Sequence, residues 1–127
     1  MKRMANPRIA PLAWYREAWE EQQEILAALT DIGMNVFAME SVLLRTAKLA
    51  AQGKGEVARD MCAVFLQEAM ELVESLARAV LAASSEGDAL RTNLAVLKRF
   101  TKSEPVNAIA LRRNVAARLL QAERYTV

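Results

Sequence analysis

The chain has 127 residues, which is enough for one domain with a single modest core. It contains no histidine and one cysteine, Cys62, which excludes sites built on imidazole and any disulfide within the chain. Apolar residues make up 54% of the sequence but aromatic residues only 6%, so the hydrophobicity comes from Ala, Leu, Val and Met. Since these residues favour helices, we expect an all-α protein.

The net charge of +2 is unevenly distributed along the chain. Residues 88–127 carry eight basic and three acidic side chains, whereas residues 1–87 carry nine basic and twelve acidic ones. The balanced total does not favour a nucleic-acid partner. Either the two parts attract one another inside a bundle, or the basic part faces an anionic partner.

Residues 1–19 are expected to form an N-terminal arm or a short helix. Pro7, Arg8 and Pro11 interrupt what would be the apolar stretch of a signal peptide, so we expect a cytoplasmic protein. The sequence contains no run of 18 uncharged apolar residues, so no membrane-spanning helix is predicted. The aromatic side chains of this segment form a candidate interface, which either folds back onto the bundle or docks on another chain; they are Trp14, Tyr15 and Trp19.

A regular helical spacing of apolar residues begins after this arm. Apolar residues recur every three or four positions from Ile25 to Ala47, with Gly33, Phe37 and Leu44 beside them, which predicts a core helix over residues 20–52 that stops at Gly53.

Three further helices are predicted over residues 56–84, 88–102 and 105–122, the last capped by Ser103 with Glu104 and Pro105 in its first turn. Short connections make consecutive helices antiparallel, so residues 20–127 should form an up-down four-helix bundle. The side chains expected in its core are Leu29, Ile32, Val36, Leu43, Phe65, Leu72, Leu76, Leu94 and Leu119.

Candidate chemistry is sparse. Glu40 and Glu68 lie near the middle of the two longest predicted helices, but a di-metal site needs four or more carboxylate or imidazole ligands, so no metal site is predicted. We expect both to be buried or half-buried and satisfied by neighbours such as Arg45. Cys62 lies among apolar residues and is expected to be a core residue without catalytic function. No glycine-rich phosphate loop occurs, and no catalytic or cofactor-binding residue is predicted.

Arg112 and Arg113 form a second candidate interface, on a predicted helix that also carries Arg118 and Arg124. Because few aromatic side chains accompany them, nucleic-acid binding is not expected. A solvated face, an acidic partner surface and membrane headgroups remain open as explanations.

A longer motif lies in the first predicted helix. The segment 29–45 opens with Leu-Thr-Asp, continues as Phe37-Ala38-Met39-Glu40-Ser41 and reaches Arg45. It resembles the C-terminal helical extension of very-long-chain-type acyl-CoA dehydrogenases and their bacterial relatives, which usually have Tyr where this chain has Phe37. The likeness continues through Met61-Cys62 and Glu68-Ala69 and, more weakly, to the last helix.

The resemblance implies a limited role for this chain. In that family an upstream flavin-binding core supplies the FAD site, the acyl-CoA pocket and the glutamate base, and the appended helical domain packs against that core. The resemblance thus implies an accessory domain for packing, dimerisation or docking in a flavoprotein of fatty-acid oxidation, with FAD held by the parent enzyme. Its partners would be the dehydrogenase core or further copies, and membrane association occurs in some members. The alternative is a stand-alone helical oligomerisation or scaffold module whose likeness is architectural only.

Overall fold

The computed structural model describes residues 22–125, and over that range the chain forms four helices and no strand. They are α2 (Gln23–Ala51), α3 (Gly55–Ser84), α4 (Gly87–Phe100) and α5 (Ala108–Ala122). The predicted all-α bundle is therefore confirmed, with helix boundaries within three residues of those expected. Residues 1–19, with Trp14, Tyr15 and Trp19, lie outside the described range.

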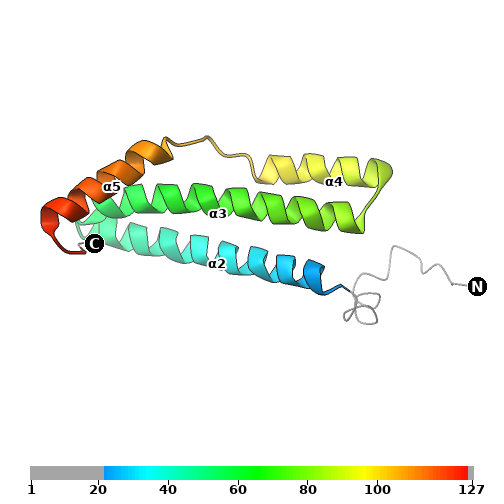
Figure 1. The fold of residues 1–127 in the computed structure, drawn as a ribbon, viewed down its shortest axis with the longest axis horizontal. Helices are drawn as coiled ribbons and strands as arrows, with labels where there is room; N and C mark the ends of the chain where they lie inside the picture. The colour runs from blue at the N-terminus through cyan, green and yellow to red at the C-terminus, as the bar shows by residue number, and fades with distance from the viewer. Residues whose placement is uncertain (1–21, 126–127) are drawn as a thin grey trace, which may run out of the picture.

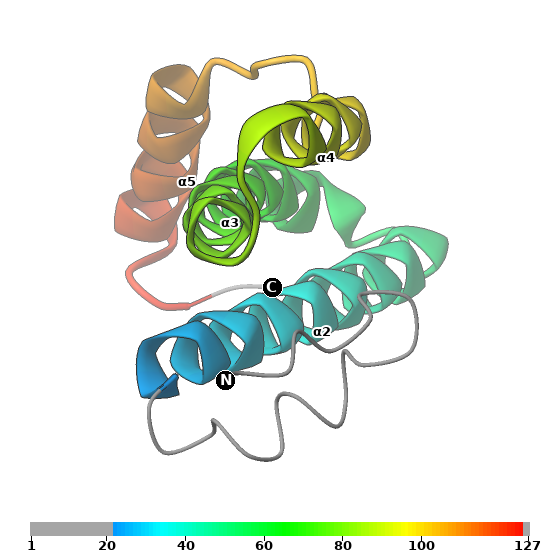
Figure 2. The ribbon, with the colours of Figure 1, turned by 90° about the vertical axis from the view of Figure 1, so that its right-hand side faces the viewer.

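The arrangement is centred on α3, which contacts each of the other three helices. Viewed end-on, α3 lies between α2 and the pair formed by α4 and α5 (Figure 2). α4 lies along the second half of α3 and α5 along the first half, so the two short helices follow one another in the direction opposite to α3 (Figure 1). As a result, α2 has only α3 as a helical neighbour within the described part of the chain.

The connection between α2 and α3 is short because two glycines shape it. Gly53 has a φ of 75°, and its N–H donates to the Ala50 carbonyl while the Lys54 N–H donates to the Leu49 carbonyl. This pattern ends the helix by satisfying its last carbonyls, as predicted for Gly53. Gly55 then begins α3 so close to α2 that a Cβ there would lie 2.7 Å from the Ala50 Cα.

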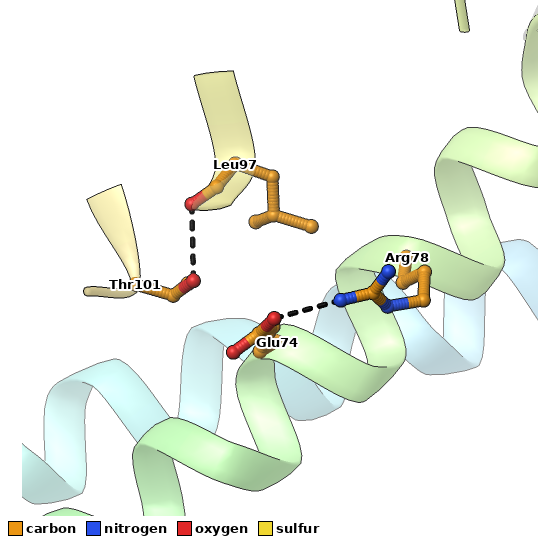
Figure 3. Close-up of polar contacts among 4 residues, drawn as sticks. All are labelled: Glu74, Arg78, Leu97 and Thr101. Carbon is orange, nitrogen blue, oxygen red and sulfur yellow. Dashed lines mark hydrogen bonds and ion pairs between the residues drawn. The ribbon is translucent and has the colours of Figure 1, made fainter. Parts of the chain in front are cut away.

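The connection from α4 to α5 is extended. At its start the buried Thr101 hydroxyl donates to the Leu97 carbonyl at 3.0 Å, beside the Glu74–Arg78 ion pair of α3 (Figure 3). Further on, the Val106 N–H donates to the Gln67 side chain of α3 at 2.9 Å. α5 begins later than predicted, because the side chain that caps it belongs to Asn107, which accepts a hydrogen bond from the Ala110 N–H at 3.0 Å.

The core is small. Met39 of α2 packs with Ala69 and Val73 of α3, and the partly buried residues around them are Ile32, Phe65, Leu66 and Met70. Small side chains line the rest of the α3 surface that is buried, including Ala58 and Cys62. Cys62 is therefore a core residue, as predicted.

Four side chains expected in the core are exposed instead, by 44–49%; these are Leu29, Val36, Leu43 and Leu72. The error for α2 has a geometric reason. Ile32 and Met39 of the predicted stripe do belong to the core cluster, but the face that packs on α3 is rotated from the stripe toward Asn35 and Val42. Because apolar residues cover a wider arc of α2 than one neighbouring helix can bury, periodicity alone did not locate the buried half.

Candidate interaction surface

The three polar residues predicted to be buried all lie at the surface. Glu40 and Arg45 are exposed, and the Glu68 side chain is 53% exposed and pairs with Arg112 of α5. This corrects the expectation that Glu40 and Glu68 are buried or half-buried and satisfied by neighbours such as Arg45: α2 and α3 turn other faces toward each other, and the α3 face that carries Glu68 borders α5.

The basic residues of α5 have two different environments. Arg112 pairs with Glu68, and the Arg118 guanidinium lies 3.3 Å from Asp60 and 3.4 Å from Glu56, all on α3. For these two arginines the attraction is internal, one of the two alternatives that the charge distribution left open. Arg113, by contrast, is exposed and forms no ion pair with residues 22–125. Of the predicted pair, Arg113 is thus the residue without an ion pair among the described residues, whereas Arg112 is exposed but paired.

The second side of α2 is apolar, and no helix within residues 22–125 covers it. We call this surface the α2 face; its large side chains are 44–72% exposed, with Gly33 and Glu40 at intervening helical positions, and it comprises Leu29, Gly33, Val36, Phe37, Glu40, Leu43 and Leu44. Single exposed apolar residues are common, but a continuous exposed row marks a surface made for contact.

By length and composition α2 also meets the criterion for a membrane-spanning helix, with mean hydropathy 1.4 and 6% of the window buried. This differs from the expectation that no segment of the sequence is apolar enough to span a membrane. A helix that packs on two protein surfaces has the same composition, and α2 carries Asp31 and Glu40 well inside its length. Since charged groups at mid-membrane are costly, two-sided packing explains the apolar character of α2 better.

A groove runs beside the α2 face and extends the apolar surface toward α3. Its volume is about 600 Å³ and its walls come from α2, α3 and the connection to α5; the lining residues are Val36, Met39, Glu40, Leu43, Ala63, Leu66, Gln67, Met70, Ser103, Glu104 and Val106. The walls are mainly apolar, with the carboxylates of Glu40 and Glu104 as the charged groups. The groove could not be predicted from the sequence, because Ser103–Val106 reach it only through the tertiary fold. The wide apolar surface of α2 was already indicated by Phe37 and Leu44 beside the apolar stripe.

The chemistry available at this surface is that of binding. Among residues 22–125, no group of three or more acidic or cysteine side chains is placed to hold a metal ion, and Cys62 is buried in the core. The groove offers apolar contact and two carboxylates, which suits a protein partner with an apolar surface.

Comparison with known proteins identifies the chain's relatives. The family model described as "Acyl-CoA dehydrogenase, C-terminal domain" matches residues 10–99. A probable acyl-CoA dehydrogenase of Bacillus subtilis (strain 168) is 43% identical over 116 residues, which are 89% of this chain and 20% of that protein. The structure of an acyl-CoA dehydrogenase complexed with FAD from Bacillus anthracis superposes with a TM-score of 0.84 at 40% identity, again over 89% of this chain and 20% of that one.

The chain therefore spans about a fifth of the length of these relatives. The resemblance expected from the segment 29–45 is confirmed by both the family model and the identity along most of the chain. The chain belongs to the family of acyl-CoA dehydrogenase C-terminal domains.

Proposed function

We propose that this chain is a non-catalytic accessory domain that packs against the dehydrogenase core of an acyl-CoA dehydrogenase-like flavoprotein of fatty-acid oxidation. The observation that carries the proposal is the α2 face: in a family domain that makes up a fifth of the length of its relatives, one apolar side of α2 has no helical neighbour among residues 22–125. A core domain is the partner that the relatives' additional length makes available.

The flavin belongs on the core in this proposal. The relative from Bacillus anthracis is complexed with FAD, but the largest hollow described in this chain does not suit that group. A dinucleotide needs N–H donors or cations around its pyrophosphate, whereas Glu40 and Glu104 would place negative charge there. No step of dehydrogenation is assigned to these residues.

Family membership also bears on the alternative of a scaffold module with no flavoenzyme link. At 43% identity over 116 residues, the likeness to an acyl-CoA dehydrogenase is more than architectural. Arg113 could take part in self-association or in contact with membrane headgroups, and both are compatible with an accessory domain. Neither contact, made through Arg113, accounts for the apolar α2 face.

The test is a chimera in which this chain replaces the matching segment of the Bacillus subtilis relative. We expect the chimera to be yellow, to retain FAD and to reduce dye in the presence of an acyl-CoA, whereas the relative lacking this segment should be less stable. The isolated chain should be colourless and bind neither FAD nor acyl-CoA at micromolar concentration. Saturable FAD binding by the isolated chain, or a chimera that behaves like the truncated relative, would contradict the proposal.

A further inference from the structure

Two carboxylates give the α2 face and its groove a negative charge. Glu40 lies in the middle of the α2 face, and Glu104 lines the same groove from the connection between α4 and α5. Both side chains are exposed, and neither forms an ion pair with another residue of the range 22–125. By contrast, Glu56, Asp60 and Glu68 of α3 have arginine partners on α5.

An apolar partner surface that covered the α2 face would remove water from Glu40. An ionised carboxylate that loses its hydration without gaining a partner is strongly unfavourable, so a surface that covers Glu40 has to supply a cation or several N–H donors. Arginine suits this position best, because its flat guanidinium lies against apolar side chains while it donates two parallel hydrogen bonds to a carboxylate.

Gly33 adds a feature of shape to the same face, two helical turns before Glu40. It lies inside α2, where glycine disfavours the helix by roughly 1 kcal/mol relative to alanine. A Cβ at this position would have no atom within 4 Å, so no contact within the described chain requires the glycine. The missing side chain leaves a notch between Leu29 and Phe37 that can receive a bulky side chain or a closely approaching backbone.

We propose that the surface covering the α2 face is an apolar patch of the dehydrogenase core that carries an arginine or lysine, which pairs with Glu40 and is attracted by Glu104. A bulky apolar side chain of the same patch enters the notch at Gly33. This inference rests on the proposed function and deepens it, because it names the chemistry of the partner surface. Glu40 then sets the orientation in which the domain docks, since a wrongly placed core would leave its charge unpaired.

Two other occupants fit the charges less well. A second copy of this chain, packed through the same face, would add the same two carboxylates, and the α2 face has no basic side chain to pair with them. The chain's own residues 1–21 contain Arg8 and Arg16 as well as both tryptophans, so they are chemically possible occupants, and the experiment has to separate them from the core.

The experiment compares Glu40→Lys and Glu40→Gln with the matched control Glu86→Lys, at an exposed residue of the turn between α3 and α4. Each change is made in the chimera with the Bacillus subtilis relative, and the rate of chymotryptic cleavage after Phe37 or Leu44 reports local opening of α2, which docking through the α2 face suppresses. Glu40→Lys should raise this rate at least tenfold and Glu40→Gln less, while Glu86→Lys leaves it unchanged. In the isolated chain, none of the three changes should alter the urea midpoint appreciably, because these side chains are exposed there.

The outcomes separate the two proposals. If the unsubstituted chimera is cleaved at Phe37 as fast as the isolated chain, the proposed function fails. If the unsubstituted chimera is protected but Glu40→Lys changes the cleavage rate no more than Glu86→Lys does, the proposed function stands and the basic partner residue is refuted. Tryptophan emission gives a third arm, because Trp14 and Trp19 are the chain's only tryptophans. Blue-shifted, quencher-resistant emission of the isolated chain that Glu40→Lys abolishes would show that residues 1–21 occupy the face, and would overturn the inference.

Discussion

Two glycines of this chain occupy opposite environments, so replacing each with alanine should have opposite effects on stability. At Gly55 an added Cβ would meet the Ala50 backbone at 2.7 Å, so the α2–α3 connection has to shift to accommodate it. Gly55→Ala should therefore destabilise the isolated chain by about 1–3 kcal/mol. Gly33→Ala should stabilise it by up to about 1 kcal/mol, because open space surrounds the site and alanine favours the helix. Urea unfolding of the two variants measures both effects, and equal signs would contradict this account.

Met39 and Leu72 form a second instructive pair. Met39 is 8% exposed at the centre of the core, so Met39→Ala should cost about 2–5 kcal/mol. Leu72 was expected in the core from its helical spacing, but it is 47% exposed, and Leu72→Ala should cost less than about 1 kcal/mol. The comparison of their urea midpoints is decisive: a larger loss at Leu72 than at Met39 would mean that α3 packs with a different face.

These residues show what the sequence could establish. Composition and spacing sufficed for the four helices and for the stop at Gly53, because local backbone chemistry decides those features. The burial of Leu29 or Leu72 depends on where neighbours lie around a helix that is apolar over a wide arc, and local spacing does not contain that information. The pairing of Glu68 with Arg112, 44 positions away in sequence, depends on the same tertiary placement.

Among the elements, α5 is the one attached by charge. Its hydrophobic contacts with α3 include Val115 and Leu119, but Ile109 and Leu120 are 63% and 79% exposed, so the ion pairs of Arg112 and Arg118 orient it. The Arg118 side chain is 31% exposed, which limits the contribution of its pairs to about 1 kcal/mol or less.

Arg118→Gln should consequently loosen α5 without unfolding the α2–α3 pair. Amide hydrogen exchange should speed up several-fold across Ala108–Ala122 and stay unchanged around Met39 and Val73. High salt should also loosen α5 in the unsubstituted chain and should act less on the variant, in which only the Arg112–Glu68 pair remains to be screened. Uniform acceleration across all four helices would instead indicate that α5 and the α2–α3 pair unfold as one unit.

At the scale of the whole molecule, the main feature is the exposed α2 face, which the small core does not cover. A partner that docks on this face would explain its apolar character. The described residues bury three side chains in the core cluster, while five large apolar side chains of the α2 face stay in contact with water. The dehydrogenase core is the partner we propose for this face, and about four fifths of each relative lies outside the matched segment.

The most direct measurement is therefore thiol labelling at Phe37, whose side chain is 72% exposed. The chain's single natural cysteine, Cys62, is buried, so Phe37→Cys introduces one reactive site, and Glu86→Cys at the α3–α4 turn serves as the control. Both sites should react rapidly in the isolated chain. In the chimera with the dehydrogenase core, the Phe37→Cys site should react at least tenfold more slowly while the Glu86→Cys site keeps its rate. Equal reactivity of the Phe37→Cys site in both settings would contradict docking through the α2 face.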